Sequence, residues 1–144
     1  MNDQDRALCA ASAGLLRASV AIAAWGLALS FIAGGVLALT GRSLPSASWV
    51  AYALVGLAGL GERYLAMRIA QESALFDALA QGRIDALASL DAAWRRLGLR
   101  RREEAPPPLA ERVLRARLLM QRHLMAVVVQ TFAFVLALAL EEWR

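Results

Sequence analysis

Residues 18–40 read ASVAIAAWGLALSFIAGGVLALT, a run of 23 residues without a charged side chain. A helix rises about 1.5 Å per residue, so this run is long enough to cross the roughly 30 Å hydrocarbon core of a bilayer. Two further apolar runs follow at 44–61 and 124–140, and the last of these is at the short end for a membrane span. The three runs predict three transmembrane helices.

The overall composition favours a membrane protein. Hydrophobic residues make up 59% of the 144-residue chain, whereas a soluble domain contains about 45–50%. The mean hydropathy is +0.48. A water-soluble bundle of this length would have to hide more apolar surface than its core can hold. We therefore expect one all-α, polytopic membrane protein whose excess apolar surface faces lipid.

Arginine is distributed unevenly along the chain. There are 16 Arg and no Lys, and 12 of the Arg lie between Arg63 and Arg122. Because basic residues accumulate on the cytoplasmic side of membrane proteins, the region 62–123 is predicted to be cytoplasmic. The segment 1–17 is then cytoplasmic as well, and the tail 141–144 is external. The Ala- and Arg-rich composition without Lys is treated as background from a GC-rich bacterial genome. The predicted location is the bacterial inner (plasma) membrane.

A signal peptide is the alternative interpretation of the run at 18–40. The run is longer than the about 7–15 residues of a signal-peptide core, and the 17 residues before it carry no net charge. In favour of cleavage, Ser46-Ala47-Ser48 has the small residues of a cleavage site. We expect the run to be retained as a membrane helix. The single cysteine, Cys9, excludes an internal disulfide.

The second helix is expected to extend beyond its apolar run. No Pro or Gly occurs in residues 62–81, so nothing there interrupts a helix that begins near residue 46. We predict one continuous helix over about 46–80, with Gly82 as the residue that ends it.

The rest of the Arg-rich region is predicted to be helical too. Apolar residues at three- and four-residue spacing predict a short amphipathic helix over 83–97. A last helix begins after the prolines at 106–108 and is expected to continue without a break to Leu140. The region 62–123 is thus predicted to form a cytoplasmic helical head from extensions of the second and last membrane helices plus the short helix.

Small residues lie on one face of the first helix at a spacing of four: Gly26, Ser30, Gly34 and Ala38. Such residues let backbones approach closely in lipid, where packing drives helix association. Gly56 and Gly59 supply small positions on the second helix. We favour packing within one subunit, and leave self-association or docking of a partner's helix as the alternative.

Charged residues gather at the predicted inner boundary of the membrane. If the second and last helices are antiparallel, positions of equal depth set Glu62 beside His123 and Arg63 beside Arg122. Structural ion pairs that fix the helices as they leave the membrane are the favoured interpretation. The alternative is that these charges line a proton or ion path, because intramembrane ionisable groups are costly and often functional.

Glu72 lies on an otherwise apolar face of the second helix, where an isolated carboxylate is costly. Arg68, one turn earlier, or Arg115 on the last helix is expected to pair with it.

His123 is the only histidine in the chain. We interpret it as a polar interface residue, with a pH-responsive role and a haem ligand as the alternatives. Gln130 and Thr131 lie in the middle of the last apolar run. They are predicted to hydrogen-bond to neighbouring helices, and lining a pore is the alternative.

Five arginines lie close together in the predicted head: Arg95, Arg96, Arg100, Arg101 and Arg102. Beside a membrane, such a cluster favours anionic lipid headgroups, or it acts only as topogenic charge. Nucleic acid is not an expected partner, because no aromatic residues are interleaved with the arginines.

The sequence contains no recognisable catalytic motif. It has no Gly-rich phosphate loop, no Cys/His metal spacing and no Ser/His/Asp set, so neither catalytic residues, metal nor cofactor is predicted. We expect a small, non-catalytic membrane subunit that associates through its transmembrane helices and presents the basic head to a protein partner or to anionic lipid. A homo-oligomeric pore or ion-conducting effector and an accessory subunit of a redox complex are the alternatives.

Overall fold

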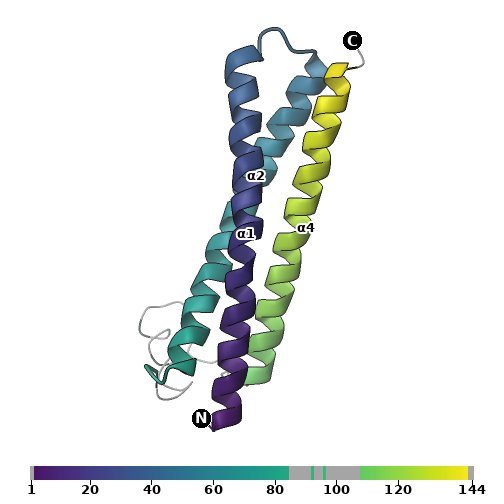
Figure 1. Cartoon of the computed structure of the whole chain (residues 1–144). Coiled ribbons are helices and arrows are strands. Elements are labelled where there is room, and N and C mark those ends of the chain that lie inside the picture. The colour runs from purple at the N-terminus through teal and green to yellow at the C-terminus, as the bar shows by residue number, and fades with distance from the viewer. Residues whose placement is uncertain (1, 85–91, 93–95, 97–107, 143–144) are drawn as a thin grey trace. The chain divides into compact units, whose positions relative to one another are not determined.

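The computed structural model describes residues 2–84, 92, 96 and 108–142. These residues contain three long helices, α1 (Asp3–Thr40), α2 (Ser46–Ala80) and α4 (Leu109–Glu142), and no strand (Figure 1). The predicted all-α class is therefore confirmed for the described part of the chain. The short helix expected over 83–97 lies largely outside it, although Ala92 and Arg96 are helical.

Helix α1 begins fifteen residues before the apolar run at 18–40. Its first turn is closed by a reciprocal cap, in which the Asp5 backbone N–H donates to Asn2 Oδ1 at 2.7 Å and the Asn2 backbone N–H donates to Asp5 Oδ2 at 3.3 Å. Asp3 and Asp5 also place negative charge at the positive end of the helix dipole. Hydropathy locates the lipid-compatible part of a helix, and the polar cap decides where the helix starts.

Helix α2 has the predicted extent, and Gly82 ends it as expected. Gly82 has a positive φ of 68°, a conformation that glycine adopts without strain. The Arg83 N–H donates to the Ala78 carbonyl at 3.0 Å, and the Gly82 N–H donates to the Leu79 carbonyl at 3.2 Å. These two bonds form a Schellman motif, which satisfies carbonyl groups that the end of the helix leaves unpaired.

Helix α4 begins directly after the prolines, as predicted. The Arg112 N–H donates to the Pro108 carbonyl at 3.2 Å, and the helix then continues unbroken for 34 residues.

The chain divides into two compact units, and each contains a part of all three helices. Unit 1 comprises residues 1–17 and 69–118, and unit 2 comprises residues 18–68 and 119–144.

Unit 1 is held by a small apolar interior and by surface ion pairs. Its buried apolar residues are Cys9, Ala13, Leu16, Ile69, Phe76, Leu79 and Ala116. Asp77 on α2 accepts Arg17 of α1 at 2.7 Å and Arg83 at 3.3 Å. The Ser73 hydroxyl donates to the Ala13 carbonyl at 3.3 Å, which adds a buried link between α1 and α2.

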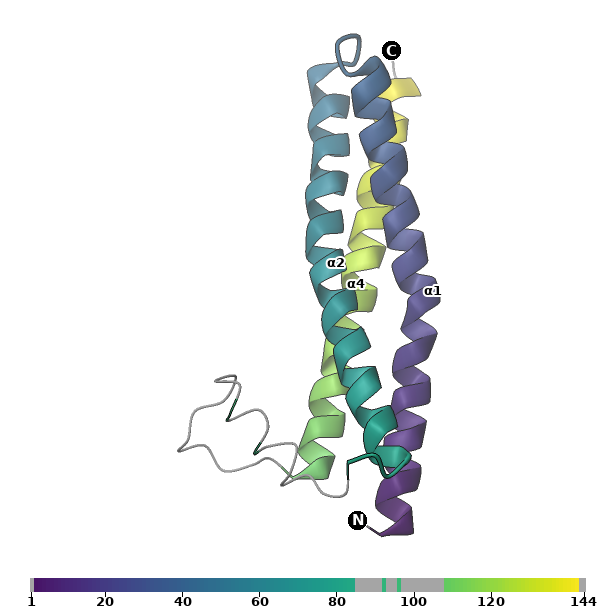
Figure 2. The same ribbon diagram turned by 90° about the vertical axis from the view of Figure 1, so that its left-hand side faces the viewer.

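In unit 2 the three helices pack side by side in both views (Figures 1 and 2). One apolar cluster fills the part nearest the 41–45 connection and consists of Leu29, Ala33, Ala51, Tyr52, Val55 and Ala137. We call these six buried residues the apolar cluster. Phe134 packs edge-on against Tyr52, with the ring centroids 6.0 Å apart.

Two helices, α1 and α4, are long and apolar enough to cross a membrane. Their most apolar windows are only 17% and 22% buried, so most residues of these windows lie on the surface of the described structure. Helix α2 does not meet the same criterion, because its apolar part, 46–61, ends at Glu62. The described residues therefore support two of the three predicted spans by length and composition.

Candidate functional site

The clearest concentration of chemistry in unit 2 is a set of polar side chains among its three helices, most of them buried. Ser30 comes from α1, Glu62 and Arg63 from α2, and His123 and Gln130 from α4. We call these five residues the polar cluster. The side chains of Glu62, His123 and Gln130 are fully buried, with no exposed surface at all.

Glu62 is the centre of the polar cluster. One carboxylate oxygen lies 2.7 Å from His123 Nε2, and Arg63 donates to the carboxylate from Nε at 2.7 Å and from Nη2 at 2.9 Å. Arg63 Nη2 also donates to the Ala23 carbonyl, which links α2 to α1. The permanent charge of Arg63 balances that of the Glu62 carboxylate, and such a match is what makes a buried carboxylate tolerable.

These contacts place a hydrogen on Nε2 of His123. A carboxylate that accepts two bonds from a guanidinium is an acceptor toward the imidazole as well, so Nε2 donates to it. In the neutral imidazole that carries this hydrogen, Nδ1 has a free lone pair and is an acceptor.

Gln130 joins all three helices two turns farther along α4. Its amide nitrogen donates to Ser30 Oγ at 2.9 Å and to the Gly26 carbonyl at 3.1 Å, and it lies 3.4 Å from the Val55 carbonyl. The Ser30 hydroxyl in turn donates to the Gly26 carbonyl at 3.0 Å. The amide therefore ties α1 to α4 and also contacts α2.

Two glycines make room for these side chains. A Cβ atom on Gly26 would lie 3.0 Å from the carboxyl carbon of Glu62 and 3.2 Å from Gln130 Oε1. A Cβ atom on Gly59 would lie only 2.0 Å from Ser30 Oγ. Only glycine fits at these two positions without displacing the polar cluster.

The face of small residues on the first helix is divided in the structure. Gly26 and Ser30 point into unit 2, whereas Gly34 and Ala38 are exposed. On α2, Gly59 is buried against Ser30, and Gly56 has no neighbour within 4 Å of an added Cβ.

Two acceptor atoms in the polar cluster lack a donor. His123 Nδ1 and Gln130 Oε1 are buried, and neither has a hydrogen-bond partner among the residues that the structure describes. A buried polar atom without a partner normally costs about 1–3 kcal/mol, so such atoms call for an explanation.

The remaining residues singled out in the sequence lie elsewhere. Arg68 and Arg122 are exposed in unit 2, and the guanidinium of Arg63 lies on Glu62 rather than beside Arg122. In unit 1 Glu72 is half-buried, and Arg115 pairs with Glu111 one turn earlier on α4.

Thr131 and the arginine group of the predicted head were also singled out in the sequence. Thr131 accepts a hydrogen bond from the Trp25 indole at 3.1 Å and donates to the Val127 carbonyl. Of the arginine group, Arg96 is exposed, while the other four lie outside the described residues, namely Arg95, Arg100, Arg101 and Arg102.

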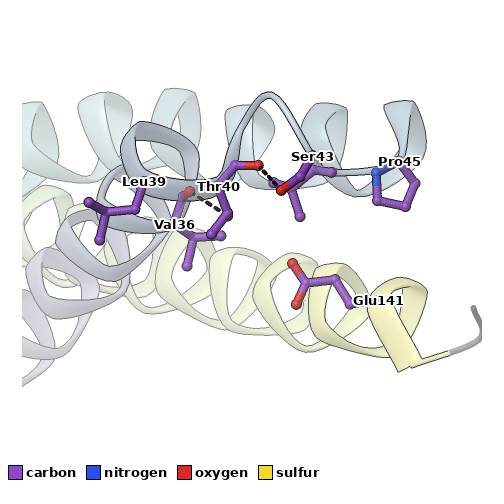
Figure 3. A pocket seen from close by; sticks show the side chains of 7 residues that line it. Val36, Leu39, Thr40, Ser43, Pro45 and Glu141 are labelled. Atoms are coloured by element: carbon purple, nitrogen blue, oxygen red, sulfur yellow. Dashed lines mark hydrogen bonds between the residues drawn. The ribbon is translucent and has the colours of Figure 1, made fainter.

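A second candidate place is an open hollow at the connection between α1 and α2 (Figure 3). Its lining is formed by Val36, Leu39, Thr40, Ser43, Leu44, Pro45 and Glu141. The hydroxyls of Thr40 and Ser43 donate to the carbonyls of Val36 and Thr40, so local bonds already use these donors. The polar cluster is the stronger site because its unpaired atoms are buried.

No family model matches this chain, and the searches found neither a curated protein nor a solved structure similar to it. The residues that the structure describes also contain no group of three metal-binding side chains. The functional argument therefore rests on the geometry of the two units.

Proposed function

We propose that this chain is a small, non-catalytic integral membrane protein with three spans, which serves as a subunit of a membrane assembly. It associates through its spans and presents its Arg-rich region to a protein partner or to anionic lipid in the cytoplasm. The single observation that carries this proposal is the inverted distribution of polarity in unit 2, where polar side chains lie inside and large apolar side chains lie outside.

The outward faces of all three helices are apolar in unit 2. Phe31 on α1 is 72% exposed, Leu60 on α2 is 69% exposed and Phe132 on α4 is 73% exposed. A soluble protein rarely exposes so many large apolar side chains, whereas hydrocarbon solvates them without cost. Helix α2 contributes to this apolar surface together with α1 and α4. This shared surface supports α2 as the third span.

The short apolar part of α2 is compatible with a span. Residues 46–61 rise only about 24 Å as a helix, less than the roughly 30 Å of hydrocarbon. A short span is accommodated by local thinning of the bilayer and by long side chains that reach the interface. Arg63 is well placed for this, since its side chain is partly exposed while its guanidinium satisfies Glu62.

The arginines supply the orientation. With 12 of 16 Arg between Arg63 and Arg122, the positive-inside rule places that region in the cytoplasm, the N-terminus inside and the C-terminus outside. The bacterial inner membrane remains the proposed location on the basis of composition.

The alternatives receive less support from the geometry. A pore formed by several copies needs polar side chains on the surface between copies, yet Ser30 and Gln130 bind each other inside one subunit. A haem ligand needs a free imidazole nitrogen that the haem can reach, yet His123 is fully buried and its Nε2 is taken by Glu62.

Reporter fusions test the topology. A fusion in the Arg-rich region near residue 100 is expected to be active only in the cytoplasm, and fusions in the 41–45 connection and after residue 144 only outside it. Alkaline carbonate should leave the protein in the membrane fraction. Recovery in the soluble fraction, or an external reporter near residue 100, would refute the proposed membrane topology.

Native mass spectrometry from nanodiscs tests the subunit role separately. A stable complex with another chain, or retained anionic lipid that is lost when Arg100, Arg101 and Arg102 are changed to Gln, is the expected result. A bare monomer without bound lipid would reject the subunit role even if the topology were correct.

A further inference from the structure

We propose that the polar cluster of unit 2 is a proton-binding site, in which the Glu62–His123 pair takes up one proton from the aqueous phase. The site is independent of the partner that the proposed subunit role requires. It stands on three features of the cluster: two buried acceptor atoms without a donor, the packing of Glu62 and Gln130 against Gly26, and its balanced charge.

Two acceptor atoms of the polar cluster have no hydrogen to accept. With Nε2 of His123 donating to Glu62, the free ring nitrogen Nδ1 is an acceptor, and Gln130 Oε1 is an acceptor by its chemistry. Both atoms are fully buried and lack a donor among the described residues. One added proton occupies the free lone pair of Nδ1.

Glu62 and Gln130 both pack against Gly26. The carboxyl carbon of Glu62 lies 3.0 Å, and Gln130 Oε1 3.2 Å, from the position that a Cβ atom of Gly26 would occupy. Protonation of the Glu62 carboxyl would turn one acceptor of the cluster into a donor.

The proton has a defined route within the pair. A proton donated by hydronium binds the Nδ1 lone pair of His123, and a water molecule is left behind. The Nε2 hydrogen then either stays on the ring or passes along the 2.7 Å contact to the Glu62 oxygen. In both forms the pair holds one more proton than before.

The charged surroundings of the pair are few. Helix α2 contributes Glu62 and Arg63, and the segment of α1 that packs there, 18–40, contains no ionisable side chain. On α4 the nearest charge is Arg122, whose side chain is exposed. Uptake of a proton therefore changes the net charge of the cluster from zero to +1, because Arg63 keeps its charge.

The apolar cluster lies between the Glu62–His123 pair and the 41–45 connection, since its α2 residues precede Glu62 and its α4 residue follows Gln130. Its one polar side-chain group is the Tyr52 hydroxyl, and Ser48 is a further buried polar residue of α2 on that side. We expect the pair to exchange its proton on the side away from the 41–45 connection.

Nitrogen NMR tests this directly, because the chain has one histidine and ¹⁵N-histidine labelling gives one imidazole. In nanodiscs, we expect both ring nitrogen signals to move as the pH is lowered. Glu62→Gln removes the negative charge and should weaken proton binding by tenfold or more. Arg63→Gln removes the positive charge and should strengthen it.

The opposite signs of these two shifts separate a proton site from a structural role, because damage to the fold would move both variants in the same direction. Glu141→Gln, which replaces an acidic residue at the far end of α4, is the matched control. It should leave the pH dependence of the ring signals unchanged. Ring signals that do not change with pH, or shifts of the same sign in the two variants, would overturn the proton site. Proton flux through vesicles that Glu62→Gln abolishes would overturn the exchange of the proton on one side only.

Discussion

Glu62 on α2 and His123 on α4 meet in the buried interior of unit 2, with 2.7 Å between the carboxylate oxygen and Nε2. The contact joins residues 61 positions apart in the chain and therefore sets the register of two antiparallel helices. Because Arg63 binds the same carboxylate and the Ala23 carbonyl, the three helices of unit 2 are coupled through one carboxyl group.

Removal of Glu62 should cost more stability than removal of His123. Glu62→Leu leaves the His123 hydrogen and the Arg63 guanidinium without their shared acceptor, and loss of one member of a buried pair costs about 3–5 kcal/mol. His123→Leu leaves the Glu62–Arg63 pair intact and loses one bond to a charged group, about 1.5–3 kcal/mol. Unfolding of each variant in detergent, followed by circular dichroism, measures the difference. Equal losses would show that Glu62 does not hold Arg63 and His123 together.

Gly59→Ala should destabilise unit 2, and Gly56→Ala should not. An added Cβ at Gly59 meets Ser30 Oγ at 2.0 Å and Gln130 Nε2 at 3.2 Å, and overpacking of this kind typically costs about 1–3 kcal/mol. At Gly56 nothing lies within 4 Å, so alanine keeps the stability or raises it by up to about 1 kcal/mol through helix propensity. Thermal unfolding of the two variants in the same detergent makes the comparison, and a loss at Gly56 as large as at Gly59 would contradict the packing.

The extents of α2 and α4 follow directly from the sequence. Pro and Gly act on the backbone itself, so the prolines before Leu109 and the glycine at Gly82 set helix ends whatever the surroundings. The start of α1 was missed because hydropathy says nothing about a helix outside the membrane. The cap formed by Asn2 and Asp5 was visible in the sequence as a pair of capping residues three positions apart.

The candidate site was predictable only in part. An antiparallel register predicts the contact between Glu62 and His123. It does not predict that the Arg63 side chain turns back to bind the adjacent Glu62. The face of small residues also divides for a geometric reason. Each step of four residues turns by about 40° around a helix, so Gly34 has rotated well away from the face that Gly26 presents to the interior. Sequence spacing alone does not show which end of such a stripe is buried.

Cys9 should react slowly with thiol reagents in the folded protein. Burial raises the pKa of the Cys9 thiol, and the nearby Asp5 carboxylate raises it further, so less of the reactive thiolate is present. Because the folded-state pKa lies above the unfolded one, this group stabilises the fold fully below its ordinary pKa and loses that effect as the pH rises through the alkaline range. Maleimide labelling should therefore accelerate sharply on unfolding. Thermal stability at alkaline pH should fall more for the native chain than for Cys9→Ala, and equal pH profiles would contradict this account.

Gln130 should tolerate an apolar replacement far better than an acidic one. Gln130→Met loses the bonds to Ser30 Oγ and the Gly26 carbonyl, but it also removes the unpaired acceptor Oε1. Since a hydrogen bond between membrane helices is worth about 0.6 kcal/mol on average, the net loss should stay near 1 kcal/mol.

Gln130→Glu has nearly the same shape, yet it directs a carboxylate at the carbonyls of Gly26 and Val55 and sets it near Glu62. An unpaired buried charge is far more costly than a lost amide bond, so this variant should fold only at acidic pH, where the new carboxyl is protonated. Circular dichroism of both variants across pH decides the matter. A Gln130→Glu protein as stable as Gln130→Met at neutral pH would mean that the amide does not face those acceptors.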